Sequence, residues 1–135
     1  MDLRLETALL TDNDVMHEKV AIFGSRGFPD HEMVRDYVYS LDETDTVVSG
    51  GARGVDQWVQ IYAEERGLAT RIFPADWGQH GKKAGMLRNH DIVATCDRLV
   101  AFWDGKSNGT RHSIELARKA GKPALVLHSP KSAPT

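Results

Sequence analysis

The sequence predicts a single α/β domain built on a parallel sheet of about five strands, and three observations lead to this prediction. Short apolar runs alternate with segments of helical periodicity along the 135 residues. Glycine-rich or polar turns follow most of these runs, as they do after the strands of parallel sheets. Length and composition, with 41% hydrophobic and 27% charged residues, are those of one ordinary globular domain.

The first half of the chain contains three predicted strands and two predicted helices. The first helix begins after Asp30, a favourable N-cap residue, and extends to about Leu41. The second helix spans about 55–66, and Gly67 ends it. The strands are short apolar runs at residues 19–23, 46–48 and 69–73.

The second half contains two further strands, two helices and a long loop. The loop is polar and runs from Pro74 to about Lys83. The helices are predicted at about 84–95 and 111–120, and Gly121 ends the second one. The strands are predicted at residues 98–103 and 123–128.

Strict alternation of strands and helices implies right-handed crossovers, and therefore a Rossmann-like three-layer domain with helices on both faces of the sheet. We assign this domain to residues 19–128. Residues 1–18 form an N-terminal extension, and residues 129–135 form a tail rich in Pro and Ser that we expect to be flexible. In such sheets ligands bind beyond the carboxyl ends of the strands.

Composition and charge exclude several classes of function. The net charge of −2 and the pI of about 6.3 provide no overall basic field, so nucleic acid is an unlikely partner. The single cysteine, Cys96, cannot form an internal disulfide, which favours the cytoplasm. No secretory signal or membrane-spanning stretch is visible, so no membrane partner is expected. The histidines lack ligand spacing, so we predict neither a metal site nor a cofactor besides a nucleotide-type ligand.

Two glycine-rich segments follow strands and are candidate anion sites. In the first, Gly24 allows close backbone approach, Ser25 follows it, and Arg26 can bind phosphate or carboxylate; a plain turn is the alternative. The second, at residues 49–56, joins a strand to a helix and would offer free N–H groups at the helix N-terminus; its alternative is a structural turn. Its candidate ligand-binding residues are Gly50, Gly51, Arg53, Gly54 and Asp56.

Two further segments complete the candidate site. Arg88 and Asn89 lie on the predicted helix after the long loop, where a solvated helix face is the alternative interpretation. Trp77 and Trp103 border the expected cleft and could stack on a base. The loop after the fourth strand contributes Asp104, Gly105, Ser107, Gly109 and Thr110, whose alternative role is to form a flexible turn that caps the next helix.

These four segments, taken in order, resemble the YspA/YpsA-related (YAcAr) branch of the SLOG superfamily. The resemblance covers roughly residues 19–128 and implies a Rossmann-like fold with a site for nucleotides or their derivatives. It implies that Gly24, Ser25 and Arg26 form the ligand floor, that the segment 49–56 forms the phosphate or ribose cradle, and that Arg88 and Asn89 lie beside it. It also implies a phage or defence setting and a homodimer or higher homo-oligomer, since relatives often dimerise.

More distant relatives suggest different activities. Residues 49–56 resemble a segment of the single-stranded-DNA-binding protein DprA, with Gly51 in place of a leucine. LOG phosphoribohydrolases and nucleoside deoxyribosyltransferases cleave N-glycosidic bonds, but this chain departs from their motifs: Asp56 stands near the place of the LOG glutamate, and the position expected for the transferase glutamate is Ser113. Glu115 lies two residues later, on a different side of the helix.

Three functions follow, of which we expect the first. The chain binds a nucleotide or nucleotide-derived ligand, such as a nucleoside phosphate or an ADP-ribose-like molecule, as a sensor or carrier. Alternatively it is a phosphoribohydrolase-like N-glycosidase, in which Asp56 assists cleavage and Arg53 stabilises phosphate. The third is a DprA-like single-stranded DNA binder, which the low net charge disfavours.

Overall fold

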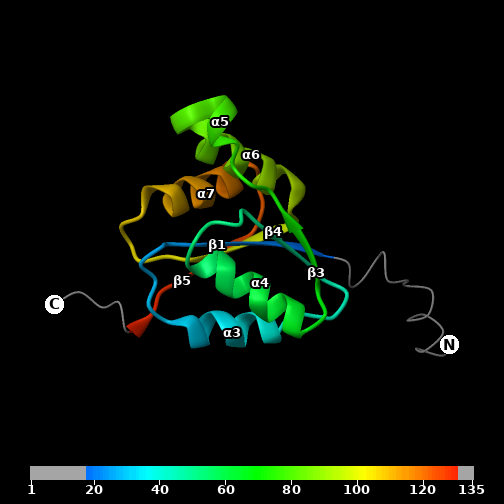
Figure 1. Cartoon of the computed structure of the whole chain (residues 1–135). Helices are drawn as coiled ribbons and strands as arrows, with labels where there is room; N and C mark the ends of the chain where they lie inside the picture. Colours follow the sequence, from blue (N-terminus) through cyan, green and yellow to red (C-terminus); the bar gives the residue numbers. More distant parts are fainter. Residues whose placement is uncertain (1–17, 131–135) are drawn as a thin grey trace.

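The computed structural model describes residues 18–130, and Figure 1 shows them as one sheet between two layers of helices. Five strands form this sheet in the order β3-β2-β1-β4-β5, and every neighbouring pair is parallel. The predicted α/β domain with a five-stranded parallel sheet is therefore confirmed. Residues 1–17 and 131–135, which hold most of the expected extension and tail, lie outside the described residues. The strands are β1 (Lys19–Gly24), β2 (Thr46–Ser49), β3 (Ala69–Ile72), β4 (Arg98–Phe102) and β5 (Ala124–Leu127).

The helices are divided between the two faces of the sheet (Figure 1). Alternate residues of the central strand β1 serve the two layers, since successive side chains of a strand point to opposite faces. Val20 and Ile22 pack in the core beneath α3 and α4, whereas Ala21 and Phe23 pack against α6 and α7. The helices are α3 (His31–Tyr39), α4 (Val55–Glu65), α5 (Trp77–His80), α6 (Ala84–Thr95) and α7 (Asn108–Lys119), with a 3-10 turn at Gly81–Lys83.

Two segments that glycine and polar residues suggested to be loops contain helical residues, because side-chain caps fix helices there, whereas the other predicted ends lie within one or two residues of the observed ones. The loop expected at 74–83 contains the short helix α5, whose N-cap Asp76 accepts a hydrogen bond from the N–H of Gln79. Helix α7 begins at Asn108 instead of 111, because Ser107 is its N-cap. The Asn108–Gly109 pair, expected to form a turn, thus belongs to the first turn of α7.

Gly24 holds the N-terminus of α4 against the end of β1. A Cβ on Gly24 would lie 2.2 Å from the Cβ of Val55, the first residue of α4. No side chain other than hydrogen fits between these two elements. The start of α4 is thereby brought next to the carboxyl end of the central strand, beside the site described below.

Candidate functional site

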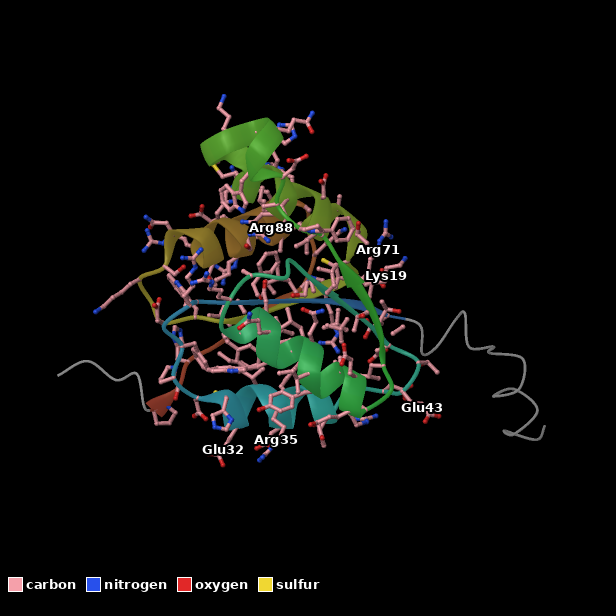
Figure 2. The ribbon with its side chains drawn as sticks, viewed as in Figure 1. Lys19, Glu32, Arg35, Glu43, Arg71 and Arg88 are labelled. Carbon is pink, nitrogen blue, oxygen red and sulfur yellow. The ribbon has the colours of Figure 1, made fainter. Side chains whose placement is uncertain are left out.

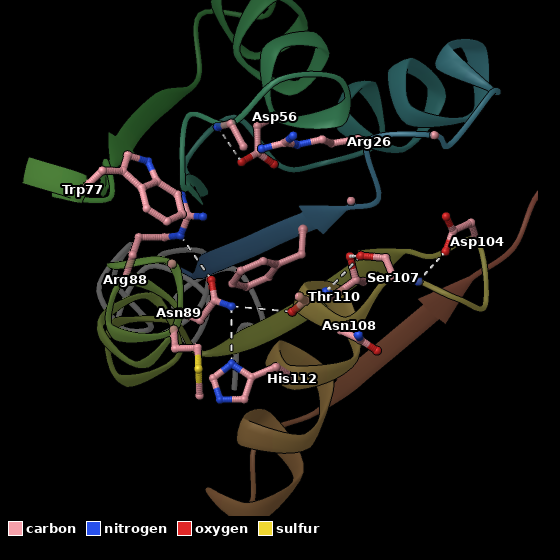
Figure 3. A pocket seen from close by; sticks show the side chains of 17 residues that line it. Arg26, Asp56, Trp77, Arg88, Asn89, Asp104, Ser107, Asn108, Thr110 and His112 are labelled. Atoms are coloured by element: carbon pink, nitrogen blue, oxygen red, sulfur yellow. Dashed lines mark hydrogen bonds between the residues drawn. The ribbon is translucent and has the colours of Figure 1, made fainter. Parts of the chain in front are cut away.

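A cleft of about 650 Å³ lies at the carboxyl ends of the paired strands β1 and β4. From β1 the chain continues outwards to β2, and from β4 it continues in the opposite direction to β5, so the cleft lies at the switch point of the sheet. Its walls come from the loops after β1, β2 and β4 and from α4, α5, α6 and α7 (Figure 3). Among the predicted site residues, those that line it are Gly24, Arg26, Asp56, Arg88, Asn89, Asp104, Ser107, Gly109 and Thr110.

Other predicted residues surround the cleft without lining it. Ser25 is buried; its Oγ accepts a hydrogen bond from the N–H of Asp104 and lies 3.5 Å from Thr110 Oγ1, so it joins the loops of β1 and β4 beneath the cleft. A Cβ on Gly54 would lie 3.2 Å from the carbonyl oxygen of Arg26, so this glycine lets two loops pass closely. The predicted residues outside the lining are Ser25, Gly50, Gly51, Arg53, Gly54 and Gly105.

Several lining residues were not predicted as site residues: Phe23, Gly27, Ala52, Gly85, Met86, Asn108 and His112. His112, one of the histidines without ligand spacing in the sequence, is half-buried on the first turns of α7. Its position three residues after Gly109 is the signal that could have found it, since residues i and i+3 share one face of a helix. Trp77 lines the cleft as expected, whereas Trp103 does not.

The carboxyl group of Asp56 lies buried at one side of the cleft and carries a raised pKa. Burial raises this pKa to about 6, against the lowering effects of a hydrogen bond from the Ala52 N–H (2.9 Å to Oδ2) and of the nearby positive charge of Arg88. Asp56 thus accepts a hydrogen bond from one of the N–H groups that were expected to bind phosphate. The partner expected for Asp56 was Arg53, but Arg53 is exposed and outside the cleft lining.

Arg88 and Asn89 connect three parts of the cleft wall. Arg88 Nη1 donates to the carbonyl oxygen of Gly50 (2.8 Å), and Arg88 Nε donates to Asn89 Oδ1 (3.1 Å). Asn89 is buried, and its Nδ2 donates to the Gly109 carbonyl oxygen at 3.5 Å. The solvated-face alternative for this pair is therefore wrong. Figure 2 contrasts Arg88, between the layers, with Arg35, which projects outwards from α3.

The loop after β4 is ordered by its own aspartate. Asp104 Oδ1 accepts hydrogen bonds from the N–H groups of Lys106 and Ser107, each at 2.8 Å. Burial acts to raise the pKa of Asp104, but these hydrogen bonds and one involving Ser25 outweigh it, and the pKa is lowered. The loop therefore presents Ser107 and the N-terminus of α7, whose first turn carries no acidic residue, to the cleft in a fixed arrangement.

His112 completes the network on the side of α7. Asn89 Nδ2 lies 3.4 Å from His112 Nδ1, and the imidazole of His90 meets that of His112 edge to face, with ring centroids 5.5 Å apart. Burial, followed by the neighbouring His90, lowers the pKa of His112, which favours its neutral form. In that form Nδ1 can accept the Asn89 hydrogen bond while Nε2 carries the proton.

Within residues 18–130, no three or more His, Cys, Asp or Glu side chains gather as metal ligands would. Over the same part of the chain, no helix has both the length and the apolar character needed to cross a membrane.

Comparison of the sequence with known proteins shows the family to which this chain belongs. Residues 18–80 match the sequence profile of the YspA, cpYpsA-related SLOG family, known as YAcAr. The Gene 61 protein of Mycobacterium phage D29 is 40% identical in sequence, over 79% of this chain and 94% of that protein. The chain belongs to the YspA, cpYpsA-related SLOG family. A phage protein is thus among the relatives of this SLOG chain.

Two solved structures of DNA processing protein A are similar in fold. The Helicobacter pylori protein, described for its single-stranded DNA binding mode, matches with a TM-score of 0.58 and 26% identity over 81% of this chain. The Streptococcus pneumoniae protein matches with a TM-score of 0.69 and 20% identity over 82% of this chain. The matches cover 64% and 50% of the two DprA chains, so this SLOG domain is shorter than either.

The expectation that nucleic acid is an unlikely partner is wrong, because the structural neighbours are DprA proteins and one is described as binding single-stranded DNA. The physical reason lies in what a net charge measures. Between residues 18 and 130 the number of Lys plus Arg equals that of Asp plus Glu, so the charge of −2 comes from residues outside the described domain. A total charge also carries no information about where basic side chains gather.

Proposed function

We propose that this SLOG domain binds a nucleoside phosphate or a nucleotide-derived ligand in the cleft, as a sensor or carrier. The observation that carries the proposal is the difference between the two ends of the cleft. The N-terminus of α7 lies at one end and the exposed indole of Trp77 at the other, and the guanidinium of Arg26 reaches into the cleft between them on the side of Asp56 (Figure 3). Anionic groups are favoured at the first end and aromatic rings at the second.

The proposed roles follow from the positions of the side chains. Arg26, with Ser107, Gly109 and Thr110 of the α7 N-terminus, would hold the phosphate. At the side of the cleft between these two ends, Asp56 is an acceptor suited to a ribose hydroxyl. The flanking residues Gly24, Arg88, Asn89 and Asp104 complete the wall, while Ser25, Gly50, Gly51, Gly54 and Gly105 shape the loops behind it.

The test is a calorimetric and thermal-shift screen of nucleoside mono-, di- and triphosphates, ADP-ribose and cyclic derivatives. A ligand that binds the folded state raises the melting temperature. We expect Arg26→Ala to lower the affinity for phosphate-bearing ligands about tenfold or more, since a charge-assisted hydrogen bond is lost. Arg118→Ala removes an exposed arginine at the opposite end of α7 and is the matched control.

Equal affinity of wild type and Arg26→Ala for every ligand would exclude the proposed phosphate position. The absence of any binding by the wild type would exclude the nucleotide ligand itself. Arg53→Ala belongs in the same series, because Arg53 was expected to contact phosphate; from its exposed position outside the lining we expect no change in affinity.

Single-stranded DNA binding is a second candidate, favoured by the likeness to the Helicobacter pylori DprA structure. It predicts that a labelled oligothymidylate binds with an affinity that falls steeply with salt concentration, as counterions return to the phosphates. Fluorescence anisotropy over a salt series measures this. If a mononucleotide then displaces the strand, both ligands use the same cleft.

N-glycosidic cleavage is a third candidate, favoured by the buried carboxyl group of Asp56 with its pKa of about 6. Arg88, whose charge acts on Asp56, would take the supporting role expected of Arg53. The test is chromatographic detection of free base after incubation with each bound nucleotide. Release that is lost in Asp56→Asn, while binding persists, would make the domain an enzyme.

A further inference from the structure

We propose that Trp77 forms the base-binding end of the cleft, on which a planar nucleobase stacks. This inference rests on the proposed function, because it assigns the end of the ligand opposite to the phosphate. It concerns a recognition subsite made by the segment that joins β3 to α6. The base could come from a free nucleotide or from a single strand, and the experiment below separates these sources.

The first observation is that a large aromatic side chain stays exposed in the wall of the cleft. Trp77 is 57% exposed and Met86 54% exposed, and both line the cleft. None of the other exposed large apolar residues of the described chain, which are Tyr39, Ile61, Leu87 and Leu125, lines the cleft. Exposed apolar surface in the wall of a cleft is typical of a binding site.

The second observation is that the indole is held in place from behind. Asp76 caps the helix α5 that carries Trp77, with Oδ1 3.0 Å from the N–H of Gln79. The indole lies so close to α6 that a Cβ on Gly85 would be 3.3 Å from Trp77 Cη2. One edge of the ring therefore rests on bare helix backbone, while more than half of the side chain stays open to solvent.

The chemistry of the indole fits a flat heteroaromatic ring. Indole offers the largest π surface of any side chain, and bases stack on it regardless of sequence because every base has a π face. A nucleobase is the part of a nucleotide that matches this surface, because ribose and phosphate gain little from an apolar ring.

The experiment compares ligands with and without a base on the full-length chain. Titration calorimetry is carried out with the four nucleoside 5′-monophosphates, ribose 5-phosphate and an oligothymidylate. The variants are Trp77→Ala, Trp77→Phe and the control Ile61→Ala, which removes a similarly exposed apolar side chain (52%) from α4. Thermal melting of each variant shows whether it is folded.

We expect Trp77→Ala to lower the affinity for nucleoside monophosphates about tenfold or more, and Trp77→Phe to retain most of that affinity. Ribose 5-phosphate binding stays unchanged in both, and Ile61→Ala behaves as wild type. A tryptophan-dependent effect confined to the oligothymidylate supports the stacking subsite and makes a strand the source of the base.

Two results overturn the proposal. Equal affinity of wild type and Trp77→Ala for monophosphates and oligothymidylate removes the stacking subsite while leaving nucleotide binding intact. An equal loss for ribose 5-phosphate and monophosphates shows that Trp77 acts on the fold of the cleft and not on the base. Failure of the wild type to bind any of these ligands overturns the proposed function together with this inference.

Discussion

The guanidinium of Arg88 occupies the space where a side chain at position 50 would begin. A Cβ on Gly50 would lie 2.2 Å from Arg88 Nη1, the atom that donates to the Gly50 carbonyl oxygen at 2.8 Å. The glycine and the arginine, 38 residues apart, thus fit together as one unit. Gly50, directly after β2, leaves space for the guanidinium of Arg88. This role differs from the ligand cradle expected from the sequence.

Gly50→Ala should therefore displace Arg88 and disturb the cleft. Because the guanidinium lies at the end of a flexible side chain and can shift, we expect a loss of only about 1 kcal/mol in the free energy of unfolding, the net worth of the displaced hydrogen bond, together with weaker nucleotide binding. Urea denaturation and calorimetry measure the two effects. Gly78→Ala is the control, since the nearest atom to its Cβ would be Asp76 Oδ1 at 3.7 Å, an ordinary contact. Wild-type stability and affinity in Gly50→Ala would contradict the proposed fit.

Gly24→Ala should destabilise the fold through Val55. The added methyl group would overlap the valine side chain at the start of α4, and we expect a loss of about 1–3 kcal/mol or more. Val55→Ala should cost stability as well, because it removes buried methyl groups. The double variant should lose less stability than the sum of the two single losses, since the smaller residue at position 55 leaves space for the methyl group at position 24. Additive losses in a double-mutant cycle would show that the two positions are independent.

The buried carboxyl group of Asp56 should make stability depend on pH. Its pKa is raised from 3.8 to about 6 by burial, so the folded state binds this proton more tightly than the unfolded state. The stabilising contribution is complete below about pH 4 and is lost as the pH rises through 6. Relative to Asp56→Asn, the wild type should lose up to about 3 kcal/mol between pH 4 and pH 7.

Urea denaturation of both proteins at half-unit steps of pH tests this dependence. Asp91→Asn, which removes an exposed carboxylate from α6, is the control for a change in surface charge. A stability difference between wild type and Asp56→Asn that stays constant from pH 4 to pH 7 would mean that Asp56 titrates alike in the folded and unfolded states.

Lys122 should contribute to stability by holding the C-terminus of α6. Its Nζ donates to the carbonyl oxygens of Val93 (2.7 Å), Ala94 (3.1 Å) and Cys96 (2.7 Å), groups that otherwise lack helical partners. Lys122→Ala should lower the free energy of unfolding by about 1–3 kcal/mol. Thermal denaturation beside the exposed-lysine control Lys119→Ala measures the effect, and equal melting temperatures would contradict it.

Sequence patterns predicted the strands and most of the helices because both depend on local periodicity. The run at 19–23 forms the central strand, which is buried from Val20 to Phe23. Gly67 and Gly121 follow the ends of α4 and α7 with positive φ, as expected for glycine after a helix. The likeness of four ordered segments to one family was also sufficient to predict the family. Strands, helix ends and family motifs can be predicted from the sequence because residues close together in the chain determine them.

Contacts between distant residues could not be predicted in the same way. Nothing near Asp56 in sequence indicates that Arg88 will lie beside it and not Arg53. The hydrogen bond that places Asn89 beside His112 likewise depends on how α6 and α7 pack. The helix α5 was missed because a helix of four residues is too short to display a period.

The order β3-β2-β1-β4-β5 has a consequence for how the chain is made. The central strand β1 precedes both of its neighbours in the chain, and residues 19–72 contain three of the five strands. These three strands are synthesised before β4. During synthesis, the open edge of β1 must therefore wait for residues 98–102, with its hydrogen-bonding groups unpaired. That interval is when the nascent chain is most exposed to aggregation, and slow translation between β3 and β4 would prolong it.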